Sequence, residues 1–482
     1  MKISEIIYRD EYIFSQVNES TDINKITTSP TDADETTLLI IPNSKNISKA
    51  AFEENRPAAV ICDAKAIIPD SVPKIIVDNP RLALSYAYYR FEEIDLNNIK
   101  LIGVTGTNGK TTTATFIKEI LDYSGYKVGF IGTGKIEIGG ECISDKNYSM
   151  TTPDPSLLYK ALKKMLQADC DAIVMEVSSH SLALEKVAPL KFDYGIFTNL
   201  SQEHTDFHSD IEDYFLTKCR LFTRCKKSFF NVDDKYARRA YSDCQSQKVS
   251  VGALWDADVR AKNVENLGFL GSSYIYQWES YSCKIELNVA GIYNVYNSML
   301  ASAVCIDMGC RPCDVKAALS KITALPGRFE IINDEITVII DYAHTDSAFY
   351  NIMKELNNLK GSSSLCVVFG CGGERDKSKR PRMAEISENF ADRIIVTEDN
   401  SRKENPKDII CDIIRGFKNK SFTVCENRVS AIEEAIINAN CGDIVAVIGK
   451  GAEKYNIDNN GYHDFDEKEI IKSALKKRKA AL

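Results

Sequence analysis

The chain has 482 residues, more than one hydrophobic core usually supports, so two or three domains are expected. Its 44% hydrophobic and 27% charged residues are typical of a globular protein, and a net charge of −8 provides no basic field for nucleic acid. The fifteen cysteines are scattered, the charged start lacks an apolar leader, and no uninterrupted apolar run could cross a membrane. We therefore expect a cytoplasmic protein with reduced thiols that binds neither nucleic acid nor membrane.

Short β-branched runs alternate with helical stretches along the chain, which is typical of a parallel α/β architecture. Three blocks can be separated: 1–98, 99–326 and 327–482. A polar connector ends the first block, and Pro326-Gly327 marks the second boundary after a helical stretch. Strands are expected in the first block at 36–42, 58–63 and 74–78, and in the third at 336–341, 364–371, 392–397, 421–425 and 443–448. The pattern predicts a small N-terminal α/β domain, a central parallel-sheet domain and a C-terminal α/β domain.

The central block opens with an apolar strand that runs into TGTNGKT (105–111) and then into a helical stretch at 112–125. A strand, a glycine-containing loop and a helix N-terminus direct backbone N–H groups at one point, which suits a phosphate. Lys110 can neutralise terminal phosphate oxygens, and the Thr111 hydroxyl can hold Mg²⁺. Val104 stands where the usual pattern has its first glycine, so Gly106 is expected to supply the turn. The segment predicts a nucleoside triphosphate site.

Four of the five histidines follow apolar runs that are expected to be strands: His180, His204, His208 and His344. The carboxyl ends of parallel strands form the ligand-binding edge of an open α/β sheet, so these side chains are expected near the phosphate loop. A lone histidine is more often structural, but three such strand ends beside a phosphate loop favour a Mg–ATP site. Glu176 and His204 are the candidate metal ligands.

Nine motifs extend this pattern over roughly residues 99–470: TGTNGKTTT (105–113), MEVSSHSL (175–182), FTNLSQEHTDFH (197–208), YFLTKCRLF (214–222), NVDD (231–234), GIYNVYN (291–297), PGRFE (326–330), DYAHT (341–345) and FGCGGERDKSKRP (369–381). In this order they resemble the Mur ligase family, the ATP-dependent ligases that build the peptide of bacterial peptidoglycan. Within the family, the motifs most resemble those of the members that add the third residue to UDP-MurNAc-L-Ala-D-Glu. The resemblance implies a P-loop ATPase-like central domain that binds ATP and a Rossmann-like C-terminal domain that binds the amino acid.

The resemblance also implies roles for individual residues. ATP would be bound by Gly106, Thr107, Asn108, Gly109, Lys110, Thr111, Thr112, Asn294, Asn297, Arg328 and Asp341. The two asparagines would lie at the base and ribose, Arg328 at the phosphates and Asp341 at the ribose. Two Mg²⁺ ions would be held by Thr111, Glu176, Lys218 and His204. Lys218 matches the lysine that is carbamylated in the family; without the resemblance it would be read as an ordinary helix lysine.

The family mechanism makes an amide bond at the expense of ATP. A substrate carboxylate attacks the γ-phosphate to give an acyl phosphate and ADP, and an amine then attacks the acyl carbon. Lys110, Lys218, His204 and Arg328 are the expected catalytic residues, because two anions must approach each other. Arg328 lies beyond the second boundary, so closure of the third domain would complete the site. We expect a monomer.

Two loops in the third block, at 398–402 and 449–453, indicate which amino acid is added. By resemblance, the amino acid would be contacted by Arg380, Asp399, Asn400, Arg402, Gly449 and Glu453. An arginine in the first loop pairs with the distal carboxylate of meso-diaminopimelate in members that add it, and lysine-adding members usually lack this arginine. Ser401 replaces the usual proline here, but Arg402 is in place. Diaminopimelate is therefore favoured, and L-lysine is the alternative.

The first block departs from the family. Ser29-Pro30-Thr31 stands where members usually carry Asp-Ser-Arg for the uridine nucleotide, so the first domain is a less certain match for the UDP-substrate domain. Contacts to the UDP substrate are expected instead from Thr151, Thr152, Ser178, Ser179 and Lys186. Three alternatives stay open: a similar ligase that acts on a different carboxylate carrier, a folylpolyglutamate-synthetase-like ligase, and an inactive subunit that only binds nucleotide.

Overall fold

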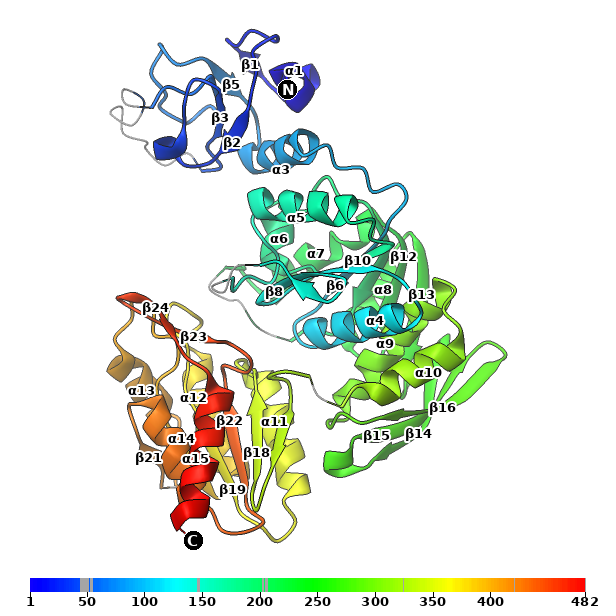
Figure 1. The fold of residues 1–482 in the computed structure, drawn as a ribbon, viewed down its shortest axis with the longest axis vertical. Helices are drawn as coiled ribbons and strands as arrows, with labels where there is room; N and C mark the ends of the chain where they lie inside the picture. The colour runs from blue at the N-terminus through cyan, green and yellow to red at the C-terminus, as the bar shows by residue number, and fades with distance from the viewer. Residues whose placement is uncertain are drawn as a thin grey trace.

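The computed structural model describes residues 1–43, 52, 55–144, 148–201, 203, 207–323, 325–419 and 421–481. Three large sheets follow one another along the chain, so the expected three-domain α/β architecture is confirmed. The N-terminal and C-terminal parts lie at opposite ends of the molecule, with the central part between them (Figure 1). The strands of the sheets span 14–76, 100–287 and 330–448, so the domain boundaries that we propose at 98/99 and 326/327 fall between sheets.

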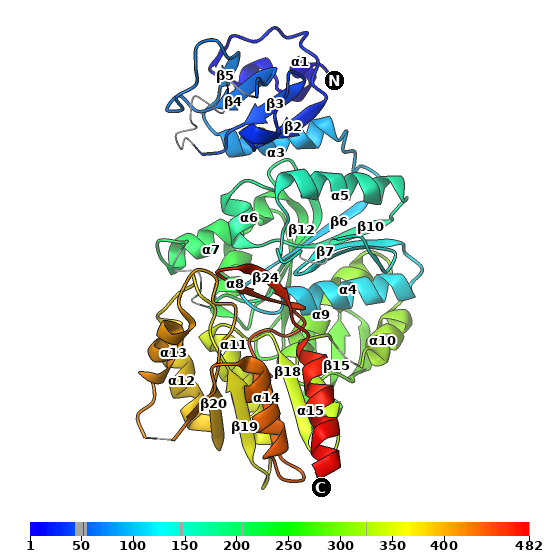
Figure 2. The same ribbon diagram turned by 60° about the vertical axis from the view of Figure 1, so that its left-hand side comes forward.

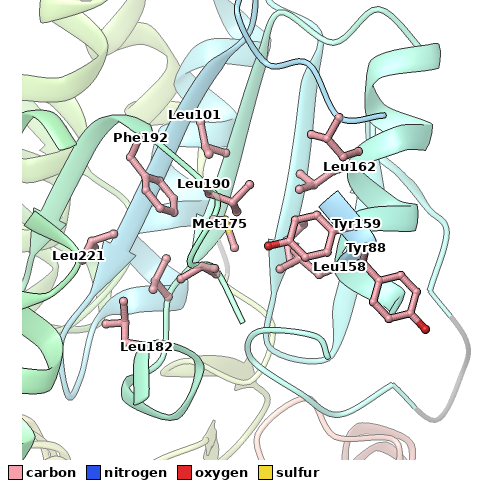
Figure 3. Close-up of a cluster of buried hydrophobic side chains, with 14 of the residues drawn as sticks. Tyr88, Leu101, Leu158, Tyr159, Leu162, Met175, Leu182, Leu190, Phe192 and Leu221 are labelled. Atoms are coloured by element: carbon pink, nitrogen blue, oxygen red, sulfur yellow. The ribbon is translucent and has the colours of Figure 1, made fainter. Parts of the chain in front are cut away.

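The N-terminal domain is built on a five-stranded sheet in the order β1-β5-β4-β3-β2, parallel except at β1. Its elements are α1 Ile3–Ile6, β1 Phe14–Ser15, β2 Lys25–Thr27, β3 Thr37–Ile40, β4 Ala59–Cys62, β5 Lys74–Ile76 and α3 Pro80–Phe91. Helix α3 begins where the Asn79 side chain accepts hydrogen bonds from two backbone N–H groups of its first turn. Tyr89 of α3 meets Tyr159 of the central domain edge to face, with ring centroids 6.0 Å apart. Tyr88 and Tyr159 belong to one cluster of buried side chains (Figure 3). This apolar contact joins the first domain to the second.

The central domain contains an eleven-stranded sheet in the order β16-β15-β14-β13-β12-β11-β6-β10-β7-β8-β9. The strands are β6 Lys100–Thr105, β7 Val128–Gly132, β8 Lys135–Ile138, β9 Glu141–Cys142, β10 Ala172–Glu176, β11 Phe192–Phe197, β12 Cys225–Asn231, β13 Gln247–Gly252, β14 Val259–Asn266, β15 Ser272–Trp278 and β16 Tyr281–Leu287. The expected parallel sheet is found from β7 to β14, but both edges are antiparallel. The exposed positions along β16 alternate with less exposed ones, as in an antiparallel strand with one face in water.

Helices cover both faces of this sheet. One face carries α4 Lys110–Tyr123, α9 Tyr293–Asp307 and α10 Pro312–Lys321. The other carries α5 Pro155–Gln167, α6 Ser179–Ala183, α7 Ile211–Cys219 and α8 Lys235–Asp243. Strands β6 and β10 are consequently buried on both sides and are almost wholly apolar. Their polar ends, which carry the site, therefore sit on a rigid support.

The C-terminal domain has a six-stranded sheet in the order β17-β18-β22-β19-β20-β21, in which only β17 is antiparallel. The strands are β17 Glu330–Asn333, β18 Thr337–Asp341, β19 Leu365–Phe369, β20 Arg393–Val396, β21 Thr423–Val424 and β22 Ile444–Ile448. The five expected strands correspond to β18–β22, of which β21 has only two residues; β17 is additional. A hairpin of β23 Tyr455–Asp458 and β24 Gly461–Asp464 follows.

Helices α11 Asp346–Leu359, α12 Lys379–Phe390 and α13 Pro406–Ile414 pack on one face of this sheet. Helices α14 Arg428–Ile437 and α15 Glu467–Ala481 pack together on the other (Figure 2). All fifteen cysteines are free thiols, as expected. Within the described ranges, no helix is long and apolar enough to cross a bilayer.

Candidate active site

A cavity of about 830 Å³ lies between the central and C-terminal domains. The carboxyl ends of parallel strands in both sheets open onto it, which is where open α/β sheets bind ligands. It collects most of the side chains that the sequence singled out: Thr107, Asn108, Gly109, Lys110, Thr111, Thr112, Thr151, Thr152, Glu176, Ser178, Ser179, Lys186, Lys218, Asn294, Asn297, Arg328, Asp341, Asp399, Asn400, Arg402, Gly449 and Glu453. The predicted sites for nucleotide, metal, UDP substrate and amino acid thus share one space.

The phosphate loop joins β6 to α4, as expected, and its two glycines are required by close packing. A Cβ on Gly106, which has φ +145°, would lie 1.9 Å from the Thr198 hydroxyl. A Cβ on Gly109, which has φ +82°, would lie 2.5 Å from the Asn297 amide oxygen. Gly109 is also the N-cap residue of α4 and offers no capping side chain, which leaves the first N–H groups of the helix for a phosphate.

Two lysines converge on this loop. Lys110 Nζ donates to the carbonyls of Gly106 and Thr107 at 3.0 and 2.8 Å, and Lys218 Nζ donates to that of Gly106 at 2.9 Å. Lys218 comes from the last turn of α7 and is only 1% exposed. Burial lowers the pKa of Lys110, and burial together with the charge of Lys110 lowers the pKa of Lys218 well below its usual range. The Lys218 amine can therefore be neutral at a pH where an ordinary lysine is charged.

Glu176 ends β10 and is completely buried at the edge of the cavity. Its carboxylate accepts hydrogen bonds from the Thr133 N–H at 2.8 Å and the Thr111 hydroxyl at 2.9 Å. Within the described ranges, no group of three or more His, Cys, Asp or Glu side chains is suited to a metal ion. His204, another of the predicted ligands, lies outside the described residues, so its role stays a prediction. A divalent ion here would need further oxygens from phosphate or water.

The segment between the second and third domains is held tightly. Arg328 Nη2 donates to the Thr111 hydroxyl at 3.2 Å, and its guanidinium lies 4.3 Å from the centre of the Tyr342 ring. The Asp341 carboxylate accepts from the N–H groups of Phe329 and Ala343 at 2.6 and 2.7 Å, and burial raises its pKa. Asp341 therefore fixes the backbone beside Arg328, and a ribose could use only its remaining lone pairs.

The two asparagines of α9 face the start of α4. Asn297 accepts from the Thr113 hydroxyl at 3.2 Å and donates to the Asn294 amide oxygen at 3.0 Å. Asn294 in turn donates to the carbonyl of Ala290 at 2.7 Å. Both side chains are buried, so this chain of hydrogen bonds sets the spacing between the phosphate loop and α9.

The residues expected to contact the UDP substrate lie behind Glu176. The Thr152 hydroxyl donates to the carbonyl that ends β10 at 2.9 Å and accepts from the Ser178 N–H at 3.1 Å. The buried Ser179 hydroxyl has no hydrogen-bond partner among the described residues, whereas Lys186 pairs with Asp154 at 2.7 Å. Among the described residues, none of the first domain lines the cavity. The cavity residues predicted for the uridine end thus all come from the central domain.

The expected amino-acid end is formed by loops after β20 and β22. Arg402 has φ +52°, and its Nη1 donates to the carbonyls of Gly373 and Asn400 at 2.8 and 3.3 Å. Asn400 Nδ2 donates to Glu453 Oε2 at 2.8 Å. Burial alone would raise the pKa of Asp399, but the nearby positive side chains of Lys450 and Arg428 hold it below its usual value. An arginine and two acidic groups thus stand at the same end of the cavity.

Arg380 does not reach this cavity, which argues against the expected contact with the amino acid. Its side chain is completely buried and forms ion pairs with Glu404 and Asp412, each at 3.0 Å. Arg375, five positions earlier in the same basic segment, lines the cavity instead. The segment GERDKSKRP contains several cations, and only the path of the loop into α12 decides which of them faces the ligand.

The histidine pattern is confirmed in part. His180 and His344 line the cavity, and His344 Nε2 lies 3.3 Å from Glu203 Oε1 across the two domains. His208 is buried with its ring centre 6.1 Å from that of His180, and its Nδ1 contacts Asp213 at 3.2 Å. Glu203 and Tyr342 also line the cavity. The sequence does not single them out, because each stands beside a more recognisable motif residue.

Comparison with known proteins places these features in a family. Residues 104–305 match the family profile of the Mur ligase middle domain, and residues 327–451 match that of the Mur ligase glutamate ligase domain. The chain is 39% identical to UDP-N-acetylmuramoyl-L-alanyl-D-glutamate–2,6-diaminopimelate ligase 1 of Clostridium acetobutylicum, over 87% of this chain and 88% of that protein. It is 34% identical to the diaminopimelate ligase of Clostridium tetani, over 98% and 99%.

A solved structure of a UDP-N-acetylmuramoyl-L-alanyl-D-glutamate–2,6-diaminopimelate ligase is similar over 99% of both chains, with a TM-score of 0.68 and 25% identity. This similarity includes the first domain, where the sequence motifs are weakest. The chain belongs to the Mur ligase family and is an ATP-dependent ligase that forms amide bonds.

Proposed function

We propose that this chain uses ATP to join meso-diaminopimelate to UDP-MurNAc-L-Ala-D-Glu, which adds the third residue of the peptidoglycan peptide. The observation that carries the proposal is the single cavity in which the phosphate loop and Lys218 of one domain meet Arg402 and Glu453 of the other. The names of the similar proteins support the same pair of substrates.

The chemistry requires two anions to meet. A carboxylate oxygen of the UDP substrate attacks the γ-phosphorus of ATP, the bond from that phosphorus to the ADP oxygen breaks, and an acyl phosphate forms. The amine of the amino acid then attacks the acyl carbon, loses a proton and displaces phosphate. Lys110 and Arg328 are cations beside this space and would offset the repulsion between carboxylate and phosphate.

The residues present fit a magnesium site that is completed by the nucleotide. Glu176 and Thr111 place a buried carboxylate and a hydroxyl 2.9 Å apart beside the phosphate loop. With the phosphate oxygens they would hold one ion, and Mg²⁺ supplies charge neutralisation there when bound. A second ion would use His204 and a modified Lys218.

The surroundings of Lys218 support its carbamylation. Its amine is buried beside Lys110, and both effects favour the neutral form. A neutral amine can add to carbon dioxide: a nitrogen–carbon bond forms, one proton leaves, and a carbamate anion remains. The modification would place an anion beside the Lys110 side chain where the neutral Lys218 amine stood, and opposite charges are the better arrangement for a buried pair.

Recognition of the amino acid would divide between two kinds of side chain. Arg402 and Arg375 would bind the distal carboxylate, because a guanidinium can make two parallel hydrogen bonds to a carboxylate. Asp399 and Glu453 would bind the distal ammonium. L-lysine lacks the distal carboxylate and would leave the two arginines without a partner, so diaminopimelate is the favoured substrate.

The test is phosphate release, with mass spectrometry of the product, from ATP, UDP-MurNAc-L-Ala-D-Glu and a panel of amino acids. The panel contains meso-diaminopimelate, L-lysine, L-ornithine and L-glutamate, and folate with L-glutamate is run separately. We expect phosphate release and an amide product with meso-diaminopimelate, both lost in Lys110→Met. Turnover with folate alone, or nucleotide binding without any turnover, would refute the proposal.

A further inference from the structure

Lys450 lies in the loop after β22, directly behind the amino-acid end of the cavity. Its side chain is 0% exposed, and it is not among the described residues that line the cavity. Three of its neighbours, Asp399, Asn400 and Glu453, do line it. Lys450 therefore cannot touch a ligand in this arrangement, although these three neighbours can.

The Lys450 ammonium has its shortest contact with Asn400. Nζ donates to Asn400 Oδ1 at 2.8 Å and to Asn456 Oδ1 at 3.4 Å. The carboxylates of Asp399 and Glu453 lie 3.9 and 3.7 Å from it, within ion-pair distance. One buried cation thus connects an amide and two acids that come from both loops.

These contacts settle which way the Asn400 amide points. An ammonium group can only donate, so the side of the amide that faces Lys450 must be its oxygen. The backbone N–H of Ile457 donates to the same oxygen at 3.0 Å. The amide NH₂ is consequently directed to Glu453 Oε2, 2.8 Å away. Without the ammonium, one of the two donors that hold this orientation would be lost.

A buried lysine is costly for the fold at this position. Burying an ammonium costs free energy that ion pairs often only offset. The charge also matters to the neighbouring acids. Lys450 lies within ion-pair distance of both carboxylates, so it offsets part of their negative charge at this end of the cavity.

We propose that Lys450 is a positioning residue for the amino-acid substrate. It orients Asn400 and offsets part of the negative charge of Asp399 and Glu453, the two carboxylates proposed to receive the ammonium group of the substrate. This inference rests on the proposed function of the cavity, and it adds a residue that acts through Asn400 and Glu453 without touching the ligand.

The experiment measures steady-state constants for all three substrates in Lys450→Met. Loss of a charge-assisted hydrogen bond to Asn400 should raise KM for meso-diaminopimelate about tenfold. The KM values for ATP and the UDP-dipeptide should stay within about twofold, because those groups lie at other parts of the cavity. Lys454→Met is the matched control: Lys454 is in the same loop, its side chain is 78% exposed, and no change is expected.

A double-mutant cycle separates positioning from general damage. If Lys450 acts through Asn400, then Lys450→Met should add little to the effect of Asn400→Ala on KM for the amino acid. Circular dichroism and thermal melting are recorded first. Should Lys450→Met fail to fold, Lys450→Gln, which keeps a neutral donor, is tested in its place and should show a smaller rise in the same KM.

Two results would overturn the inference. One is an unchanged KM for meso-diaminopimelate in the folded Lys450 variants, and the other is an equal loss for all three substrates, which would indicate a purely structural role. If the wild-type enzyme ligated no amino acid of the panel, the proposed function would fail and this inference with it. Normal wild-type ligation with unaffected variants would remove only the role of Lys450.

Discussion

Replacing Arg402 by alanine should remove most of the selectivity for meso-diaminopimelate over L-lysine. Arg402 Nη1 is already committed to the carbonyls of Gly373 and Asn400. Its guanidinium has no other hydrogen bond within the described residues, so the edge formed by Nε and Nη2 remains for one bidentate carboxylate.

The size of the expected loss follows from the two hydrogen bonds that this edge of the guanidinium can donate. Two charge-assisted hydrogen bonds at about 1.5–3 kcal/mol each give about 3–6 kcal/mol. Arg375 lines the same cavity and can compensate part of the charge, so the lower end of that range applies. At about 1.4 kcal/mol per decade, kcat/KM for meso-diaminopimelate should fall about a hundredfold. The value for L-lysine should change little, because L-lysine has no carboxylate at that position.

The assay is phosphate release with each amino acid at saturating ATP and UDP-dipeptide. Arg393→Ala is the matched control. Arg393 begins β20, the strand that leads to the loop of Arg402, and lies at the end away from the cavity, so kcat/KM should be unaltered for both amino acids. An unchanged ratio between the two amino acids in Arg402→Ala would refute the reasoning. If the wild-type enzyme used L-lysine at least as well, the identity of the third residue would be wrong and the ligase chemistry would stand.

Three further predictions test other parts of the molecule. Lys218→Ala should lose most activity and recover partly with short carboxylates, and full activity of the unrescued variant would exclude the carbamate. Bicarbonate should reactivate CO₂-depleted wild-type enzyme, because burial lowers the pKa of Lys218 and so raises the fraction of neutral amine at a given pH. UDP should compete only weakly with the UDP-dipeptide, because the first domain lacks Asp-Ser-Arg, and inhibition at low micromolar UDP would indicate a complete uridine pocket. Gly327→Ala should lower stability by about 2 kcal/mol or more in thermal melting, since its φ is +64° and a Cβ would lie 2.0 Å from the Ala452 nitrogen. Gly361→Ala, with φ +58° and open space around it, should cost less; equal losses would mean that the close contact between Gly327 and Ala452 is unimportant.

The phosphate loop could be read from the sequence because its parts are contiguous. A buried strand, a loop with two glycines and a helix follow one another within a short stretch, and local geometry is enough to aim their N–H groups. The strand ends that carry Glu176 and Asp341 were also predictable, because apolar runs followed by polar residues mark the edge of a parallel sheet. The order of the motifs, through the family resemblance, also predicted the loops that contain Arg402 and Glu453.

Other features depend on contacts between distant segments, and no local pattern indicates them. Lys218 looks like any helix lysine until α7 packs against the phosphate loop and buries its amine. Arg380 and Arg375 are five residues apart in one basic segment, yet ion pairs with Glu404 and Asp412 bury the first while the second lines the cavity. Burial and hydrogen-bond partners are properties of the packed chain, so tertiary structure alone decides which cations line the cavity and which, like Lys450, lie behind it.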